Sequence, residues 1–462
     1  MKLKKYDIVY FIGIGGIGMS ALARWFKVNG YKVFGYDLVS RPFTDQLASE
    51  GISIHFEDDI HLIPEEVKNN PETTLVVYTP AVPSSNQELQ FFKENGYNCH
   101  KRSEVLGCIT KNKFTIAVAG THGKTTTSSI LTHILKTAGW NISAFIGGLT
   151  GNYSTNFIYE KNNRKEQYIL VEADEFDRSF LTLHPDIAIV TSADADHLDI
   201  YGDKGELQKG FGDFIKNIKP GGLLVLNDVL GEFKEHNEKI TIETYGINRG
   251  QFFANNISMK DGFFYFDLYA DNTLIKELKL GIPGFYNVEN AVAAITVALS
   301  LEIPPSVIRL ALGSFKGVKR RFEYIIDKPE LIYIDDYAHH PEEIRAFISS
   351  LRKMYPERNI AVVFQPHLYS RTRDFAIEFG KSLSLADEVY LLDIYPAREK
   401  PIPGVTSDLI FQHITCNHKM KCSINELTQI LQKRKHEVIA TVGAGDIENV
   451  VEELKNCLVK KA

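Results

Sequence analysis

The residues best suited to chemistry form a glycine-rich turn at positions 120–125, GTHGKT. The apolar run 114–119 is predicted to be a buried strand, and apolar residues recur at helical spacing after Lys124. In such a turn, backbone N–H groups and the positive end of the helix face an anion, while the lysine adds a point charge. Val118 stands where the longer phosphate-loop pattern has its first glycine. A helix merely capped by glycine is the alternative, but the coincidence of strand, helix and GKT triplet favours a loop that binds ATP phosphates.

A triphosphate on this loop needs Mg²⁺, which prefers hydroxyl, carboxylate and water oxygens. Thr125 provides a hydroxyl, and Glu172 ends the predicted strand 168–171. His197 is a candidate for a second metal position. Either residue could instead be structural, but a neighbouring phosphate loop favours the metal role. We therefore predict a Mg²⁺ site, which Mn²⁺ could also fill, at Thr125, Glu172 and His197.

A second glycine motif, Gly13-x-Gly15-x-x-Gly18, follows the predicted strand 8–12. The next predicted strand, 31–36, ends at Asp37. This pattern is typical of dinucleotide-binding folds, in which the glycines admit a pyrophosphate and the acid holds a ribose. It indicates a diphosphate at a helix N-terminus and leaves the nucleotide open. A nicotinamide-dependent oxidoreductase is one alternative, but it leaves residues 120–128 and the last third of the chain unexplained.

The last third repeats the strand–loop rhythm, with predicted strands at 331–334, 359–364, 388–392 and 438–442. Chemistry in parallel sheets collects at the carboxyl ends of strands. His339, His367 and Arg371 lie at such ends and could provide a base and a carboxylate clamp for an amino acid. Arg320 and Arg321 precede this region. They could form a solvated basic turn, or one of them could reach a transferring phosphoryl group from a hinge.

The composition is that of an ordinary globular chain of 462 residues, large enough for about three domains. A formal charge of −6 argues against nucleic acid or an anionic membrane as the main partner. The five scattered cysteines suggest reduced thiols in a cytoplasmic protein. Glycines interrupt the first apolar run, so it is predicted to be a strand and not a signal peptide, and no run approaches the ~20 apolar residues of a membrane span. Polar turns predict domains at 1–111, 112–317 and 318–462, with a small antiparallel insertion at 251–279.

Taken together, these motifs resemble the Mur ligase family over essentially the whole chain. The motifs that carry the resemblance are GIGGIGMSALA (13–23), GTHGKTTTS (120–128), EADEFDRSF (172–180), DADHLDIYG (194–202), PGFYNVENAVAA (283–294), KRRFE (319–323), DDYAHHPEEI (335–344), FQPHLYSRT (364–372) and GAGDI (443–447). The resemblance implies an α/β fold of three domains. These are a Rossmann-like UDP-binding domain, a central P-loop ATPase-type domain and a C-terminal Rossmann-like domain that binds the amino acid.

The resemblance also implies a role for each site residue. The UDP-sugar would contact Gly15, Gly16, Gly18, Asp37, Asn86, His122 and Ser179. ATP would contact Gly120, Thr121, His122, Gly123, Lys124, Thr125, Thr126, Asn287, Asn290, Arg321 and Asp336. The amino acid would contact Tyr337, His339 and Arg371. The catalytic set would be Lys124, His197, Arg321 and His339, and the metal ligands Thr125, Glu172 and His197.

The implied reaction joins L-alanine to the lactyl carboxylate of UDP-N-acetylmuramate. The carboxylate attacks the γ-phosphate of ATP, and the amine of alanine then displaces phosphate from the acyl phosphate. Leu368 stands where some relatives have arginine, so the carboxylate clamp is expected to rest on Arg371 alone or to use another group in addition. Tyr286 stands where many relatives have histidine. Within the family, the ligase that recycles a whole tripeptide is the alternative, and the HLDIYG and DDYAHHPEE segments favour the alanine branch. An inactive nucleotide-binding regulator is disfavoured by the intact Lys124, Glu172 and His197. The expected partners are small molecules, and the chain is expected to be a monomer or a homodimer.

Overall fold

The computed structural model describes residues 2–162, 166–194, 201, 203–270, 273–397 and 399–459. Contacts divide the chain into two compact units. The first comprises residues 1–253, 269–274 and 291–312, and the second residues 254–268, 275–290 and 313–462. In the described ranges, no helix has the length and apolar character that a membrane crossing requires.

The first unit opens with a five-stranded parallel sheet in the order β3-β2-β1-β4-β5. Its strands are β1 (Ile8–Ile12), β2 (Lys32–Tyr36), β3 (Ser53–His55), β4 (Thr74–Tyr78) and β5 (Asn98–Lys101). Its helices are α1 (Ile17–Val28), α2 (Pro42–Ser49), α3 (Glu65–Lys68), α4 (Gln87–Glu94) and α5 (Arg102–Thr110). Continuous apolar runs such as β1 and β4 are buried on both faces, as parallel strands covered by helices require.

The same unit contains the strand order β12-β11-β10-β6-β9-β7-β8. The strands are β6 (Phe114–Ala119), β7 (Ile142–Phe145), β8 (Phe157–Glu160), β9 (Tyr168–Glu172), β10 (Ile187–Val190), β11 (Leu223–Asn227) and β12 (Thr241–Ile247). Helices α6 (Lys124–Thr137) and α8 (Lys204–Lys216), and the 3₁₀ segment η3 (Phe176–Thr182), connect them. All pairings are parallel except β7–β8. One hydrophobic cluster extends from Tyr6 to Phe233 and joins the two sheets into one unit.

A buried polar cluster interrupts the apolar side of the first sheet. The Tyr10 hydroxyl donates to Glu88 Oε2 at 2.6 Å and lies 2.8 Å from His55 Nε2. Glu88 is fully buried, and burial raises the pKa of its carboxyl group to about 8. Asp58 accepts from the backbone N–H groups of Gln87 and Glu88, at the start of α4. The cluster therefore keeps a carboxyl group inside the domain in its neutral form.

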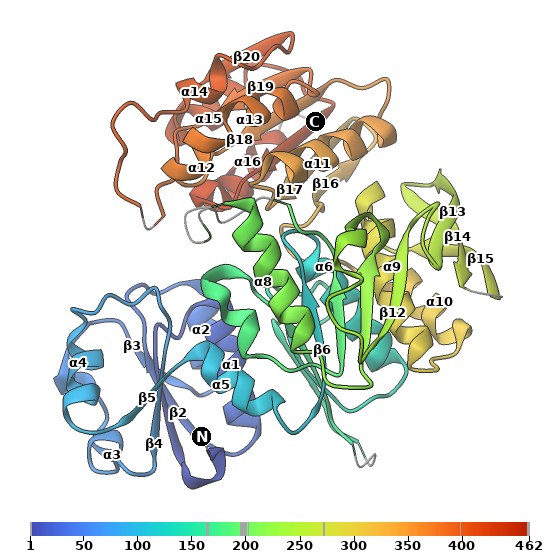
Figure 1. Ribbon diagram of the computed structural model, residues 1–462. Coiled ribbons are helices and arrows are strands. Elements are labelled where there is room, and N and C mark those ends of the chain that lie inside the picture. Colours follow the sequence, from blue (N-terminus) through green and yellow to red (C-terminus); the bar gives the residue numbers. More distant parts are fainter. Residues whose placement is uncertain are drawn as a thin grey trace. The chain divides into compact units, whose positions relative to one another are not determined.

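The second unit carries a six-stranded sheet in the order β16-β17-β21-β18-β19-β20, parallel except for the edge strand β16 (Figure 1). The strands are β16 (Glu323–Lys328), β17 (Leu331–Asp336), β18 (Ile360–Phe364), β19 (Glu388–Leu391), β20 (His418–Lys421) and β21 (Val438–Val442). The helices are α11 (Pro341–Met354), α12 (Tyr369–Asp374), α13 (Ala376–Leu383), α14 (Asp408–Phe411), α15 (Ile424–Leu431) and α16 (Val451–Val459). The expected α/β architecture is thus confirmed.

The segment predicted as a small insertion forms three strands that neighbour one another in chain order. These are β13 (Phe252–Lys260), β14 (Phe263–Ala270) and β15 (Thr273–Leu280). Helices α9 (Phe285–Ser300) and α10 (Pro305–Ser314) follow. Helix α9 begins directly after Pro283-Gly284. Both predicted nucleotide-binding asparagines, Asn287 and Asn290, therefore belong to a helix.

Candidate functional site

The phosphate loop connects β6 to α6 and requires glycine at two positions. Gly120 has φ +134° and Gly123 has φ +80°. Residues other than glycine rarely adopt these backbone conformations. A Cβ on Gly120 would also lie 2.0 Å from the Thr191 hydroxyl and 2.9 Å from the backbone nitrogen of Ser192. The loop is therefore packed directly against the chain that follows β10.

Residues 191–194 hold the loop by hydrogen bonds that the sequence did not suggest. The backbone N–H of His122 donates to Ser192 Oγ at 2.8 Å, and that of Thr121 donates to the Ser192 carbonyl at 3.2 Å. The N–H of Asp194 donates to the Thr121 hydroxyl at 3.1 Å. The Nε2 atom of His122 lies 3.6 Å from an Asp194 carboxylate oxygen. These bonds fix the shape of the loop before α6 begins at Lys124.

Lys124 makes a buried ion pair with Glu175, a residue that the sequence analysis did not single out. Its ammonium nitrogen lies 2.9 and 2.8 Å from the two carboxylate oxygens of Glu175 and 2.5 Å from the Gly120 carbonyl. Glu175 is fully buried. Burial by itself lowers the pKa of Lys124, but the carboxylates of Glu175, Asp174 and Glu172 together more than offset this effect, so the pKa is raised. The ammonium group thus stays charged at the mouth of the loop.

Two of the three predicted metal ligands lie together. The Thr125 hydroxyl donates to Glu172 Oε1 at 2.7 Å, and the Gly147 N–H donates to Oε2 at the same distance. A hydroxyl and a carboxylate at a phosphate loop are the hard oxygen donors that suit Mg²⁺. His197 lies outside the described residues. Within those described, no three His, Cys, Asp or Glu side chains form a metal-sized cluster.

Most of the predicted UDP-sugar residues lie at two places, the first glycine motif with Asp37 and the segment after β9 that contains Ser179. The N–H of Gly15 donates to Asp37 Oδ2 at 2.7 Å, and Gly16 caps the start of α1. Ser179 donates to the Asp174 carbonyl and lines a small pocket with Glu172 and Arg102. Arg102 is thus a pocket residue that the sequence analysis missed, since it belongs to no motif.

Asn86 differs from the other predicted UDP-sugar residues in its surroundings. It is buried, and its side-chain oxygen caps α4 by accepting from Leu89 N–H at 2.9 Å. The structure therefore gives this oxygen a structural role at the start of the helix, and any contact of Asn86 with a ligand stays a prediction.

In the second unit, several predicted residues gather where β17 ends. Asp336 is buried, and its two oxygens accept from the N–H groups of Phe322 and Ala338 at 2.7 and 2.8 Å. Burial raises the pKa of Asp336 to about 6. The Tyr286 hydroxyl lies 3.5 Å from the same carboxylate, which brings the start of α9 to this strand end. Next to Tyr286, the side-chain amide of Asn290 donates to that of Asn287 at 3.1 Å.

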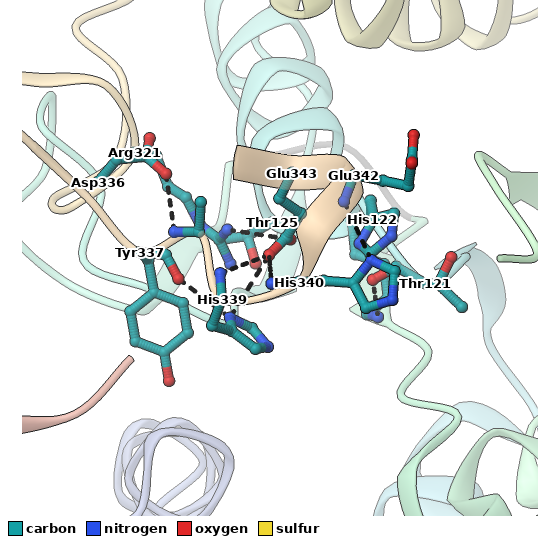
Figure 2. A network of polar contacts seen from close by, with 12 residues as sticks. Thr121, His122, Thr125, Arg321, Asp336, Tyr337, His339, His340, Glu342 and Glu343 are labelled. Atoms are coloured by element: carbon teal, nitrogen blue, oxygen red, sulfur yellow. Dashed lines mark hydrogen bonds and ion pairs between the residues drawn. The ribbon is translucent and has the colours of Figure 1, made fainter. Parts of the chain in front are cut away.

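Two of the predicted alanine-binding residues, Tyr337 and His339, come directly after Asp336 in the chain. Figure 2 shows them together with Arg321 and Glu343. His339 Nδ1 lies 3.0 Å from the Tyr337 carbonyl, which can only accept, so Nδ1 carries the hydrogen and Nε2 is the nitrogen able to take up a proton. Glu343 accepts from the backbone N–H of His339 at 2.9 Å and lies 3.8 Å from Arg321. Sequence reasoning missed Glu343, which connects the predicted base to the predicted hinge arginine.

Arg371 lies in α12, directly after β18, and is buried. The preceding Leu368 is buried at φ +73°, an uncommon conformation for leucine that fixes the start of α12. The His367 ring lies 6.0 Å from that of His339 and 5.8 Å from that of Tyr395. The ends of β17, β18 and β19 therefore bring His339, His367 and Tyr395 into one row.

Arg320 is not part of a solvated turn, which was one of the two possibilities that the sequence left open. Its guanidinium binds Asp335 and Glu448 at 2.9 Å and the Gly443 carbonyl at 2.7 Å. The neighbouring Arg321 lies over the Tyr337 ring, 5.0 Å from its centre. The turn is thus anchored by Arg320, and Arg321 is the arginine that lies beside the predicted alanine-binding residues.

Comparison with known proteins covers almost the whole chain. Three family models match in order: "Mur ligase family, catalytic domain" over residues 8–114, "Mur ligase middle domain" over 118–298 and "Mur ligase, glutamate ligase domain" over 320–447. The UDP-N-acetylmuramate–L-alanine ligase of Flavobacterium psychrophilum is 49% identical and covers 100% of both chains. That of Christiangramia forsetii is 46% identical over 98% of each.

Solved structures agree with the sequence comparison. The UDP-N-acetylmuramate-alanine ligase of Thermotoga maritima has a TM-score of 0.79 and 29% identity, covering 98% of this chain and 99% of that one. A murein peptide ligase of Psychrobacter arcticus has a TM-score of 0.70 at 23% identity, with 98% of each chain covered, and shares the fold. The chain belongs to the Mur ligase family.

Proposed function

We propose that this chain is an ATP-dependent ligase that joins L-alanine to the lactyl carboxylate of UDP-N-acetylmuramate, releasing ADP and phosphate, in the synthesis of peptidoglycan precursors. The observation that carries the proposal is the phosphate loop, where the charged Lys124 lies beside the 2.7 Å contact between Thr125 and Glu172. Relatives with that activity in their names are 44–49% identical over nearly all of their length.

The first step must activate a carboxylate, which is a poor electrophile. The lactyl carboxylate attacks the γ-phosphate of ATP and becomes an acyl phosphate, while negative charge spreads over the transferring group. Lys124 and Arg321 are the cations assigned to that charge. Thr125 and Glu172 would hold Mg²⁺, together with His197, and a bound Mg²⁺ would neutralise part of the phosphate charge.

The second step forms the amide. The α-amine of alanine attacks the acyl carbon, the carbon–oxygen bond to phosphate breaks, and the amine loses a proton. The Nε2 atom of His339 can accept that proton, because Nδ1 is hydrogen-bonded to the Tyr337 carbonyl. Arg371 is assigned to the carboxylate of alanine, because a guanidinium binds carboxylates through two parallel hydrogen bonds.

The remaining assignments follow from the same reaction. Residues 1–111 would bind the UDP-sugar through Gly15, Gly16, Gly18, Asp37, Asn86 and Ser179, and His122 would face its carboxylate. Residues 112–317 would bind ATP through the loop 120–126 with Asn287 and Asn290, joined by Asp336 at the ribose. Residues 318–462 would bind alanine. A cytoplasmic location fits a reaction that consumes ATP and a UDP-sugar.

Phosphate release from ATP tests the proposal directly. With the purified full-length chain, release should require both UDP-N-acetylmuramate and L-alanine, and Lys124→Ala should abolish it. Lys136→Ala, in the last turn of the same helix, is the matched control and should leave the rate of phosphate release unchanged. Turnover with the tripeptide L-alanyl-γ-D-glutamyl-meso-diaminopimelate but not with alanine would transfer the assignment to a recycling ligase, and oxidation of NAD(P)H without ATP would refute a ligase altogether.

A further inference from the structure

The first residue of α5, Arg102, lies against the first glycine motif. A Cβ built on Gly18 would be 2.3 Å from Nη1 of Arg102, 2.9 Å from Cζ and 3.1 Å from Cδ. The guanidinium therefore occupies the space that the absent side chain of Gly18 leaves. In this chain the third glycine of the motif makes room for a cation beside the loop.

The charges around this guanidinium are unusual. Gly18 lies in the first turn of α1, which contains no acidic residue, and the Asp37 carboxylate accepts from the Gly15 N–H in the loop before it. Arg102 is also the first residue of its own helix, α5, whose first turn contains Glu104. The Arg102 guanidinium thus adds a positive charge next to the N-terminal end of α1, where a bound anion is favoured.

The protein's own anion at this place is a weak partner. Among the described residues, the one charged group paired with Arg102 is Asp174, whose carboxylate is 3.8 Å away and 41% exposed. This distance exceeds that of a hydrogen bond. Arg102 also lines a small pocket near the end of β9, together with Ser179, Glu172 and Asp174.

We propose that Arg102 binds the diphosphate of the nucleotide-sugar, together with the backbone N–H groups of residues 15–18. This inference rests on the proposed function. It adds the Arg102 side chain to the diphosphate site that the sequence predicts at the glycine motif and Asp37. The diphosphate is favoured over the lactyl carboxylate because the guanidinium lies at the glycine motif itself. A planar guanidinium matches two phosphate oxygens at once, which an ammonium group cannot do.

Calorimetric titration of the full-length chain, with Mg²⁺ and a non-hydrolysable ATP analogue present, tests the proposal. The ligands are UDP, UDP-N-acetylglucosamine, UDP-N-acetylmuramate and UMP. Arg102→Ala should weaken binding of the three diphosphates by a common factor of about 10 to 100, since a hydrogen bond to a charged group contributes that much. UMP lacks the second phosphate and should be affected less than threefold. Arg102→Lys should recover part of the loss.

Lys27→Ala is the matched control, because it removes one positive charge at the other end of α1, where Lys27 binds the Gly51 carbonyl. It should leave all four affinities unchanged. A loss confined to UDP-N-acetylmuramate would overturn the proposal and assign Arg102 to the lactyl carboxylate. Equal affinities in Arg102→Ala and the wild type, or a parallel loss of affinity for the ATP analogue, would leave Arg102 a structural residue. If the wild type binds no diphosphate, the proposed function fails as well.

Discussion

Removing one partner of the Lys124–Glu175 ion pair should destabilise the first unit far more than removing a surface charge. Glu175 is fully buried, and the Lys124 side chain is only 14% exposed. Breaking such a pair leaves a buried charge without its counter-ion and costs about 3–5 kcal/mol. Glu175→Ala should therefore lower the unfolding free energy of this unit by about 3 kcal/mol or more. Lys124→Met should have a similar effect, because it leaves the carboxylate buried instead.

Tryptophan fluorescence during urea unfolding reports on this unit selectively. The chain contains two tryptophans, Trp25 and Trp140, and both lie within residues 1–253. The control is Lys136→Ala, which removes an ion pair with Glu160 from the same helix as Lys124. Both of its partners are about one-third exposed, so the loss should stay below about 1 kcal/mol.

The double variant Lys124→Met/Glu175→Leu decides between a buried ion pair and general damage to the loop. Two apolar side chains of similar volume leave no uncompensated charge, so the double variant should be more stable than either single variant. The coupling between the two positions should reach about 3 kcal/mol. The buried ion pair would be refuted if the losses of unfolding free energy in the two single variants simply add in the double variant. It would also be refuted if Glu175→Ala costs no more stability than Lys136→Ala.

Three further outcomes are expected. Arg371→Ala should raise the KM for alanine at least tenfold and leave the KM for the UDP-sugar unchanged; equal alanine kinetics would remove Arg371 from the clamp. Burial raises the pKa of Glu88 to about 8 in the folded chain, so the folded chain binds more protons than the unfolded chain between pH 5.5 and 7.5. Over that range the wild type should lose about 3 kcal/mol of stability relative to Glu88→Gln, and parallel urea midpoints would contradict this. Gly120→Ala should abolish ATP binding, measured by calorimetry, because its Cβ would clash with Thr191.

Local sequence pattern predicted the strands that carry the site. The runs 8–12, 114–119 and 438–442 became β1, β6 and β21 with the same limits. Each is a short apolar or β-branched segment that ends at glycine or polar residues, and in a covered parallel sheet such a segment has few other stable arrangements. The phosphate loop was predictable for the same reason, since its glycines and lysine are consecutive in the chain.

Non-local charge pairs were not predictable. Glu175 lies 51 residues from Lys124, and Arg320 lies 128 residues from Glu448. Nothing in the spacing of these residues identifies the partner, which is fixed only when strands from different parts of the chain become neighbours. The end of β17 was misjudged for a related reason. Asp335 and Asp336 were expected in a loop, but they continue the strand because they pair with Thr441 and Val442 of β21.

The two arginines at 320 and 321 are adjacent, yet the fold gives them different surroundings. Arg320 and Phe322 both have positive φ, at 59° and 50°, and such a conformation costs about 1–3 kcal/mol in a residue other than glycine. The ion pairs of Arg320 and the burial of Phe322 hold these two conformations in place. Because both neighbours are fixed, the backbone direction of Arg321 is imposed from either side, and its guanidinium is directed toward Tyr337 and Glu343. Of the two adjacent arginines, Arg320 is therefore the anchor of the turn, whereas Arg321 lies 3.8 Å from Glu343.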